Sequence, residues 1–248
     1  MEWTDAALVL RVGRFRETDL WLRLLTRQHG VLSAFAFGGS RSRRRFTGCL
    51  DLLNVIHVRA KATRGGAYLN LEEGSLLEGP RRLRQDWRRL GMLMNCVRFL
   101  EAQGVASDTA QATFALMRSL LRLGEEADVL RDALPVLFRF RLASEQGYAP
   151  DFSQCGQCGA MLTSVSWFGL EDGILLCDEC HAAHGGRRLN PLSAPVLAAL
   201  CSVQADDPAV WNSLEMDAGD WRACTRLADS FVQFHLGLAW DRGRFTRR

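Results

Sequence analysis

Four cysteines lie in two Cys-x-x-Cys pairs, Cys155/Cys158 and Cys177/Cys180, with 18 residues between the pairs. Each pair places two thiolates on one tight turn, and two such turns that face each other form a cage of four sulfurs. Tetrahedral sulfur ligation is the geometry that Zn²⁺ adopts in closed structural sites. Because four protein ligands leave no open position for water, the spacing predicts a structural Zn²⁺ ion and not a hydrolytic centre.

Other chemistries fit only parts of this pattern. Cys177–His181 matches a c-type haem attachment motif, but the opening MEWTDAALVLRV does not resemble a secretory segment, and the first pair would remain unexplained. Disulfides are typical of small secreted scaffolds, and no βαβ pattern surrounds the pairs as in a thiol redox site. His181 or His184 remains an alternative ligand in place of one cysteine. The other cysteines are expected to be reduced and at least partly buried: Cys49, Cys96, Cys201 and Cys224.

The charge of the chain is unevenly distributed. Residues 1–91 carry 17 Lys+Arg against 9 Asp+Glu, a net charge of +8, whereas residues 92–248 carry 14 against 19, a net charge of −5. This asymmetry predicts that the basic part contacts a polyanion. No run approaches 18 uncharged apolar residues, so a membrane span is not expected. Reduced cysteines and an opening segment unlike a signal peptide predict a cytoplasmic location.

Hydrophobic patterns predict an α+β multidomain protein. Strands are expected at Ala6–Val12, Leu20–Arg27, Val31–Phe37, Leu52–Ala60 and Ala67–Glu73, with turns at Gly30 and Thr63–Gly66, a layout that favours a small barrel. Helices are expected at Arg84–Gln103, Asp108–Leu123, Val129–Gln146, Ser193–Ser202 and Gly219–Trp240. Pro135 predicts a kink or a late start near Leu134, and Gly147 predicts a stop. Val165–Leu170 and Gly173–Leu176 are predicted to form the hairpin of a zinc ribbon-like module.

These elements predict three domains. The first is a five-stranded barrel over residues 1–79, and the second is a helical domain over residues 80–150 and 187–241. The cysteine module, residues 151–186, is inserted into the helical domain. Residues 242–248 give no readable signal.

The basic residues of the barrel are candidates for contact with nucleic acid. A glycine-hinged, flexible loop carries Arg41, Arg43, Arg44 and Arg45, and Arg11, Arg14, Arg16, Arg23 and Arg27 extend this track. Arginine neutralises phosphate and releases condensed counterions. A second cluster holds Arg81, Arg82 and Arg84, followed by Arg88 and Arg89, with ion pairing to Glu72, Glu73 and Glu78 as the alternative. Trp21, Phe35, Phe37 and Phe46 are the nearby aromatic candidates for base stacking, although each such ring is more often a core residue. Phe35 and Phe37 share one strand face, and Trp21 and Phe46 are the two chosen for testing.

Several short motifs occur in a recognisable order: Glu17-Thr18-Asp19, Leu24–Leu32, Gly38-Gly39-Ser40-Arg41, Phe138–Leu142, and Gly147–Pro150 shortly before Cys155. This order resembles the RecO family of DNA repair and recombination mediators. The resemblance implies an oligonucleotide-binding (OB) barrel, a helical domain and a zinc module. It also implies binding of single- and double-stranded DNA, annealing of complementary strands, and action with RecR to replace single-strand-binding protein by RecA at the nucleoid.

Single-strand-binding proteins end in a short acidic, apolar tail, and a site for this tail needs arginines beside an apolar groove. Arg131, Phe138, Arg139 and Arg141 are the candidates. No nucleophile elbow, P-loop or HExxH motif occurs, so the chain is not expected to be an enzyme. A zinc-dependent nucleic-acid enzyme would need a His-x-Glu motif, which is absent. The remaining alternatives are a transcription-associated DNA-binding protein and a zinc-stabilised protein-interaction scaffold.

Overall fold

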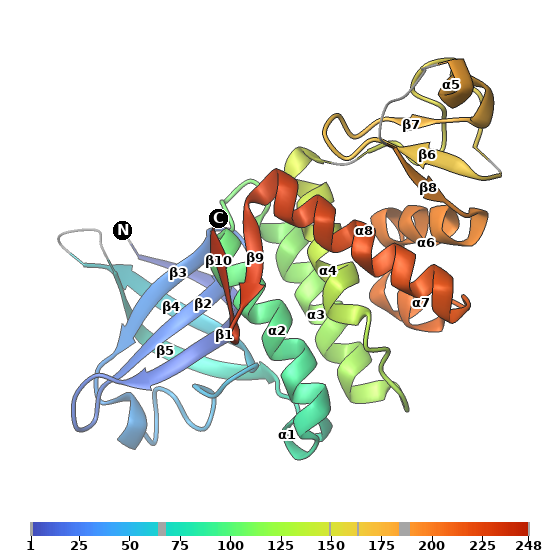
Figure 1. The fold of residues 1–248 in the computed structure, drawn as a ribbon. Helices are drawn as coiled ribbons and strands as arrows, with labels where there is room; N and C mark the ends of the chain where they lie inside the picture. The colour runs from blue at the N-terminus through green and yellow to red at the C-terminus, as the bar shows by residue number, and fades with distance from the viewer. Residues whose placement is uncertain (1, 64–67, 149, 163, 184–188, 248) are drawn as a thin grey trace. The chain divides into compact units, whose positions relative to one another are not determined.

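The computed structural model describes residues 2–63, 68–148, 150–162, 164–183 and 189–247 (Figure 1). The chain forms two compact units. The first unit comprises Met1–Leu93 and Gly104–Ala127, and the second comprises Met94–Gln103 and Asp128–Arg248. Helix α2 (Trp87–Gln103) contributes residues to both units. The predicted division into three domains stays a prediction.

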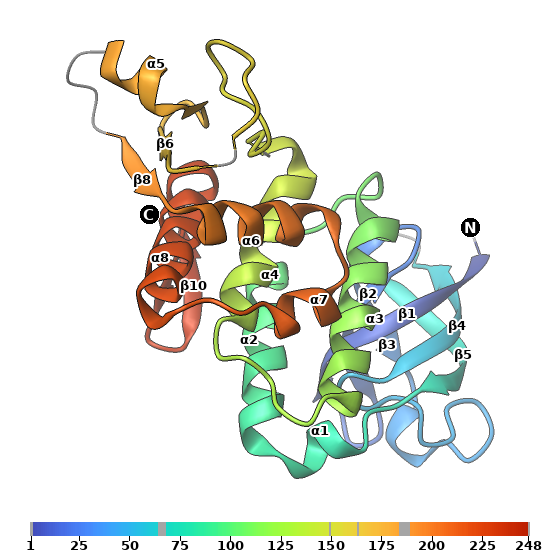
Figure 2. The ribbon, with the colours of Figure 1, turned by 90° about the vertical axis from the view of Figure 1, so that its right-hand side faces the viewer.

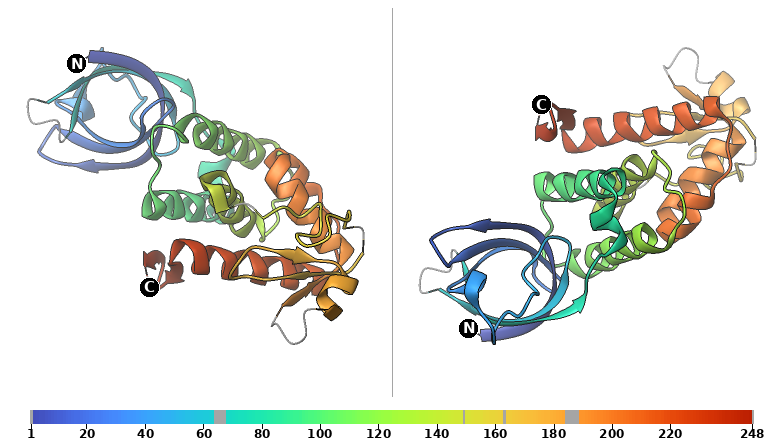
Figure 3. Two further views of the ribbon diagram at one scale, coloured as in Figure 1. Left: turned by 90° about the horizontal axis from the view of Figure 1, so that it is seen from above. Right: turned by 90° about the horizontal axis from the view of Figure 1, so that it is seen from below.

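Five strands of the first unit form a closed barrel, whose ring of strands is visible in Figure 3. They are β1 (Glu2–Arg14), β2 (Leu20–Thr26), β3 (Gly30–Ala36), β4 (Val55–Ala62) and β5 (Leu69–Glu78). β1 pairs antiparallel with both β2 and β4, and a short parallel pairing of β3 with β5 completes the ring. All five strands were predicted, with bounds that differ by a few residues. The predicted positions at 64–67 lie outside the described residues.

The barrel core is filled by alternate residues of the strands, because successive side chains of a strand lie on opposite faces. Leu22 and Leu24 of β2 are fully buried in this core. Phe46 and Cys49, from the loop between β3 and β4, also belong to it. The same loop carries the predicted DNA-binding residues Arg41 and Arg43–Arg45, and Phe46 and Cys49 anchor it to the barrel.

Helix α3 (Ala110–Glu126) contacts β2 and β3. The turn between β2 and β3 lies very close to the backbone of the segment before α3. Gly30 has a φ of +73°, and a Cβ added there would lie 2.1 Å from the carbonyl oxygen of Val105. Both the left-handed backbone and the close approach require glycine at this position.

The predicted helix at Arg84–Gln103 is wrong at its start. The structure has a short helix α1 (Arg82–Gln85), and α2 begins only at Trp87. Asp86, between them, is extended, and its Oδ1 accepts hydrogen bonds from the backbone N–H groups of Arg88 and Arg89 at 2.9 and 3.2 Å. Since a side chain that caps a new helix ends the preceding one, Asp86 divides the predicted helix in two.

The second unit contains four further helices of its bundle (Figure 2): α4 (Leu134–Ala143), α6 (Ala194–Ala205), α7 (Pro208–Ser213) and α8 (Ala218–Leu236). α4 contacts the other three, and Phe140 of α4 packs against Phe231 of α8 with ring centroids 5.2 Å apart. The late start of α4 at Leu134 was predicted from Pro135. α7 was not predicted; Asp207 caps it by accepting from the N–H of Ala209.

The cysteine module also lies in the second unit. Its strands are β6 (Ser166–Phe168), β7 (Leu175–Leu176) and β8 (Asn190–Leu192), and helix α5 (Asp178–Ala183) follows β7. β6 pairs with β7, as the predicted hairpin requires, and also with β8, which was not predicted.

The chain ends in a β-hairpin of β9 (Leu238–Asp241) and β10 (Arg244–Arg247). The prediction of helix as far as Trp240 is therefore wrong at its end. Gly237, with a φ of +62°, ends α8 in the left-handed conformation typical of helix C-termini. None of the described helices is long and apolar enough to cross a membrane.

Candidate metal site and nucleic-acid interface

The four predicted cysteine ligands converge. The Sγ atoms of Cys155, Cys158, Cys177 and Cys180 all lie within 4.8 Å of one another, and those of Cys158 and Cys177 are 3.8 Å apart. A tetrahedral ion with metal–sulfur bonds of ~2.3 Å requires sulfur–sulfur edges of about 3.8 Å. The four sulfurs therefore form a cage of the size that could hold a metal ion.

Backbone hydrogen bonds hold the first cysteine pair in a tight turn. The N–H of Gly156 donates to the carbonyl oxygen of Leu175 at 2.7 Å, and that of Gly159 donates to the carbonyl oxygen of Cys155 at 2.9 Å. The N–H of Cys177 points at the Sγ of Cys155, at 3.4 Å. Such N–H groups stabilise a thiolate, which is the form that binds metal.

The thiols of the cage differ in acidity. Burial opposes ionisation of Cys155, but hydrogen bonds from backbone N–H groups, of Cys158 and Cys177 among others, lower its pKa to about 6. Burial, followed by hydrogen bonds with the neighbouring thiols, raises the pKa of Cys180 to about 12. The Cys155 thiol is therefore the more acidic of the two, and a bound metal cation would lower the pKa of Cys180.

Two histidines, His181 and His184, were considered as metal ligands in place of one cysteine. His181 lies outside the sulfur cluster, and its ring stacks on Trp167 with centroids 3.8 Å apart. His184 lies outside the described residues. The remaining cysteines are free; Cys49, Cys96 and Cys224 are buried and Cys201 is half-buried, which confirms the prediction.

The basic segment of the loop between β3 and β4, residues 38–46, is anchored at its start and at its end. The N–H of Gly38 donates to Asp19 at 2.7 Å, and the N–H of Gly74 on β5 donates to the carbonyl oxygen of Arg45 at 2.8 Å. Phe46 fills the barrel core. The description of this loop as flexible is therefore corrected: it is a fixed platform for its arginines.

The four arginines of the loop are exposed but not equivalent. Arg45 donates to the carbonyl oxygen of Phe37 at 2.5 Å, and Arg41 lies 3.7 Å from the carboxylate of Glu17. Among the described residues, Arg43 and Arg44 have no ion pair. Arg44, Arg45 and His57 line a polar hollow of about 310 Å³ on the barrel. Arg43 and Arg44 are therefore the arginines best placed to neutralise an external phosphate.

An exposed group of aromatic rings lies next to this loop. It consists of Phe15, Phe35, Phe37 and Tyr68, which we call the aromatic surface. Phe35 is central, with ring centroids 4.9 Å from Phe15, 5.3 Å from Tyr68 and 6.2 Å from Phe37, whose ring is nearly parallel. The other three rings are 44–51% exposed. Because exposed rings offer faces to unstacked bases, this surface suits single-stranded nucleic acid.

The choice of stacking residues from the sequence is therefore partly wrong. Phe46 is only 2% exposed, because the loop turns it into the barrel core. Trp21 is opposite Phe35 in the β2–β3 ladder and thus on the same face, where its indole covers Gly13. Phe35 and Phe37 are not core residues. Strand parity could have shown this, since both alternate with Ala34 and Ala36, which face inward.

The other arginines of the predicted track have mixed roles. Arg23 donates to the hydroxyl of Ser33 at 2.8 Å, and Arg11 has a partner within the chain. Arg14 and Arg27 are exposed, and the guanidinium of Arg16 lies 5.4 Å from the ring centroid of Phe15. Arg14 and Arg16 can thus add positive charge beside the aromatic surface.

The second basic cluster is largely structural. Arg84 donates to the carbonyl oxygen of Leu52 and to Asn54, both at 2.8 Å. Arg89 is buried and donates to the carbonyl oxygens of Gly124 and Ala127. Glu72 and Glu73, offered as alternative partners of this cluster, form ion pairs with Arg59, and Glu78 forms one with Arg118.

Glu125 supplies the negative charge expected at the start of α1. Its carboxylate accepts the backbone N–H groups of Arg81, Arg82 and Leu83 at 2.8–3.1 Å. These N–H groups need no external anion. The side chains of Arg81, Arg82 and Arg88 are exposed, so these members of the cluster remain candidates for DNA contact.

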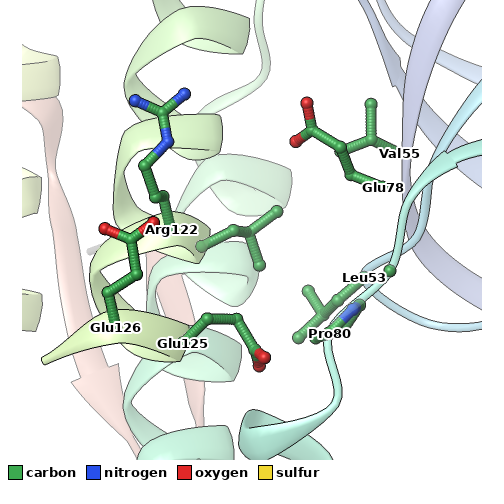
Figure 4. Close-up of a pocket in the computed structure, with 9 residues that line it drawn as sticks. Leu53, Val55, Glu78, Pro80, Arg122, Glu125 and Glu126 are labelled. Atoms are coloured by element: carbon green, nitrogen blue, oxygen red, sulfur yellow. The ribbon is translucent and has the colours of Figure 1, made fainter.

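Glu125 also lines a pocket of about 260 Å³ in the first unit, shown in Figure 4. Leu53, Val55, Pro80 and Leu121 form its apolar part, whereas Glu78 and Glu126 add further carboxylates and Arg122 one cation. The excess of carboxylates makes this pocket unsuited to phosphate.

The residues predicted to bind an acidic tail are engaged inside the second unit. Phe138 is fully buried and offers no surface to a partner, which corrects its assignment. Arg139 pairs with Asp229 at 2.5 Å, and Arg141 pairs with Glu145 at 2.7 Å. Arg131 donates to the carbonyl oxygen of Asn212 at 2.8 Å. The phenylalanine is thus part of the core, and the three arginines form hydrogen bonds or ion pairs within the unit.

Comparison with known proteins identifies the family. Residues 1–80 match the family model "Recombination protein O N terminal", and residues 84–244 match "Recombination protein O C terminal". The "DNA repair protein RecO" of Nitratidesulfovibrio vulgaris is 49% identical, and that of Lawsonia intracellularis 45%, each over the full length of both chains. The protein of the same name from Anaeromyxobacter dehalogenans is 30% identical over 96% of this chain and 93% of its own. The chain belongs to the RecO family of DNA repair proteins.

Proposed function

We propose that this protein is a DNA-binding recombination mediator. It anneals complementary single strands and, with RecR, helps to replace single-strand-binding protein by RecA during recombinational repair. Membership of the RecO family supports the role in DNA repair. The observation that carries the proposal is the position of the basic loop beside the aromatic surface, linked by the hydrogen bond from Arg45 to the backbone of Phe37.

The proposed mechanism is binding without bond-making. Two strands repel each other through their phosphates, and arginines remove this repulsion by neutralising phosphate and releasing counterions. Arg43 and Arg44 supply this charge from a fixed loop, and Arg41, Arg14 and Arg16 extend it. The rings of Phe37 and Tyr68 hold bases by stacking, which tolerates any sequence. A strand held in this way keeps its bases accessible to a complement.

The barrel is proposed to be an OB fold. Five strands with β1 paired to both β2 and β4 support this assignment. The binding elements lie on β3 and on the loop that follows it, which agrees with the use of the strand 2–3 face by OB folds.

The four cysteines are proposed to hold Zn²⁺ in a structural role. All four ligands come from the protein, and the sulfur–sulfur distance of 3.8 Å fits a tetrahedral ion. The ion would link the turn after Phe152 to the start of α5. The acidic residues around it, including Asp178 and Glu179, argue against a finger that enters a DNA groove.

A strand-annealing assay tests the proposed function. Two complementary labelled oligonucleotides without self-complementarity are mixed with and without the purified full chain. The expected result is annealing at least tenfold faster with protein, and faster in low salt than in high salt. Annealing at the protein-free rate in dilute buffer, with no shift of either single strand on a gel, would contradict the proposal and favour a protein-interaction scaffold.

A further inference from the structure

The C-terminal β-hairpin has an exposed surface that the barrel site does not explain. Its turn, Arg242-Gly243, has positive φ at both residues, 44° and 86°, as a two-residue hairpin turn of type I′ requires. β9 and β10 pair from Leu238/Arg247 to Asp241/Arg244. The two strands and their turn therefore form a regular β-hairpin.

This hairpin is fixed to the rest of the second unit. The ring of Phe245 packs edge-on against Phe99 of α2, with centroids 5.1 Å apart, and Leu238 is buried. Arg98 of α2 donates to the carbonyl oxygen of Gly243 at 3.0 Å. These contacts hold the position of the hairpin from both its base and its turn.

Trp240 remains available on this fixed hairpin. Its side chain is 44% exposed, although its ring contacts Phe245 at 4.8 Å between centroids. The guanidinium of Arg98 lies 6.0 Å from the centroid of the Trp240 ring. A half-exposed indole with a cation beside it is the combination that binds an unstacked base and its phosphate.

The hairpin is positively charged, whereas the C-terminal part of the chain to which it belongs has a negative net charge. Residues 92–248 have a net charge of −5, yet the hairpin strands and turn carry Arg242, Arg244 and Arg247 against one carboxylate, Asp241. All three arginines are exposed, and none makes an ion pair with another described residue. Arg131, Arg139 and Arg141, by contrast, have partners within the unit.

We propose that the surface formed by Arg98, Trp240, Arg242, Arg244 and Arg247, which we call the hairpin surface, binds a single strand of nucleic acid. This inference rests on the proposed annealing function and adds a second contact to the barrel site. Annealing needs two strands at once, and two separate single-strand sites on one chain supply them. A duplex is disfavoured as ligand because its bases are stacked and offer no free face to Trp240.

An acidic protein tail is a less suitable ligand for this surface. A tail with an apolar end needs a hollow for its side chain beside a cation. The hollow next to Trp240 and Phe245 is lined by Asp132 and Asp229, which repel a carboxylate, and its arginine, Arg139, is already paired with Asp229. A polynucleotide needs no such hollow.

The test compares variants of the full chain. The hairpin variant Arg242→Ala/Arg244→Ala/Arg247→Ala is measured beside Arg222→Ala/Arg226→Ala, which removes exposed arginines of α8, and beside the loop variant Arg43→Ala/Arg44→Ala. Trp240→Ala is measured beside Trp240→Phe, which keeps an aromatic face. Thermal unfolding shows whether each variant is folded. The probes are a labelled 30-nucleotide thymidine oligomer, the annealing pair, and a labelled acidic peptide that ends in phenylalanine.

We expect the hairpin variant to anneal about tenfold more slowly and to lose about 2 from its salt slope for single strands. Trp240→Ala should slow annealing, and Trp240→Phe should restore it. A 5-iodouracil oligonucleotide should crosslink to the peptide that contains Trp240. The Arg222/Arg226 variant should behave as the unsubstituted protein.

Two results would overturn this inference while leaving the barrel site intact. One is unchanged annealing and salt slope in the hairpin variant while the loop variant loses both. The other is loss of acidic-peptide binding in the hairpin variant with no change in oligonucleotide binding. If the unsubstituted protein neither binds nor anneals oligonucleotides, the proposed function itself fails, and the inference fails with it.

Discussion

The backbone N–H of Gly74 on β5 donates to the carbonyl oxygen of Arg45 at 2.8 Å, so the basic loop is tied to the barrel wall. Together with the burial of Phe46, this contact fixes where the neighbouring guanidinium groups can reach. A fixed loop loses less conformational entropy on binding than a mobile one. The loop is therefore best described as a preformed cationic edge of the barrel.

Removing Arg43 and Arg44, which form no ion pair with another described residue, should weaken nucleic-acid binding without unfolding the barrel. Arg43→Ala/Arg44→Ala should lower affinity for single and double strands alike, because both ligands present phosphate. Fluorescence anisotropy at low salt measures this change. Arg122→Ala/Arg222→Ala, which removes two other exposed arginines, is the control. Arg45→Ala is less informative, since it also removes the hydrogen bond to Phe37.

Removing a ring of the aromatic surface should affect single strands selectively. Tyr68→Ala and Phe37→Ala should each weaken single-strand binding by roughly 1–3 kcal/mol, because stacking needs an unpaired base. Duplex affinity should change much less. Trp87→Ala is a suitable control, since Trp87 is 85% exposed and belongs to another part of the first unit. Equal losses for single strand and duplex would mean that these rings do not stack on bases.

Loss of one cage sulfur should destabilise the second unit. Cys177→Ser removes a ligand, and a structural metal contributes directly to folding free energy. We expect one zinc per chain by metal analysis of the unsubstituted protein, no zinc in the variant, and a lower unfolding temperature. Cys201→Ser, which changes a half-buried lone thiol, is the control. A metal-free Cys177→Ser protein of unchanged stability would show that the cage does not need an ion.

Substitution of Glu125 should destabilise the first unit in a pH-dependent way. Burial opposes ionisation of Glu125, but the N–H groups of Leu83, Arg82 and Arg81 outweigh it and lower the pKa. A lowered pKa in the folded state gives stability that is complete above the unfolded-state pKa of about 4.5 and is lost as pH falls through the folded value.

Glu125→Gln should therefore cost about 1 kcal/mol at pH 7, and the cost should shrink in acid. Urea unfolding at pH 7 and pH 3.5 measures both values. Glu126→Gln, on the exposed side of the same helix, is the control. A cost that is independent of pH would mean that the carboxylate charge plays no part in capping α1.

The cysteine site and the five strands could be predicted from sequence because their signals are local. Ligand spacing determines which sulfurs share a turn, and alternation determines which face of β2 is buried. Phe46 was misassigned because a long loop has no periodicity, and only the fold shows that it returns to the barrel core. The roles of Glu125 and Arg84 were missed because their partners lie more than 30 residues away in sequence.

The salt dependence of single-strand binding tests the central claim most directly. The equilibrium constant of the full chain for a thymidine oligomer is measured from low to physiological salt, for the unsubstituted protein and for Arg43→Ala/Arg44→Ala. The account predicts a steep linear fall of log K with log salt, and a slope about 1.4 smaller in the variant, since each phosphate contact on a single strand contributes about 0.7. Binding that does not respond to salt, or an unchanged slope in the variant, would contradict it.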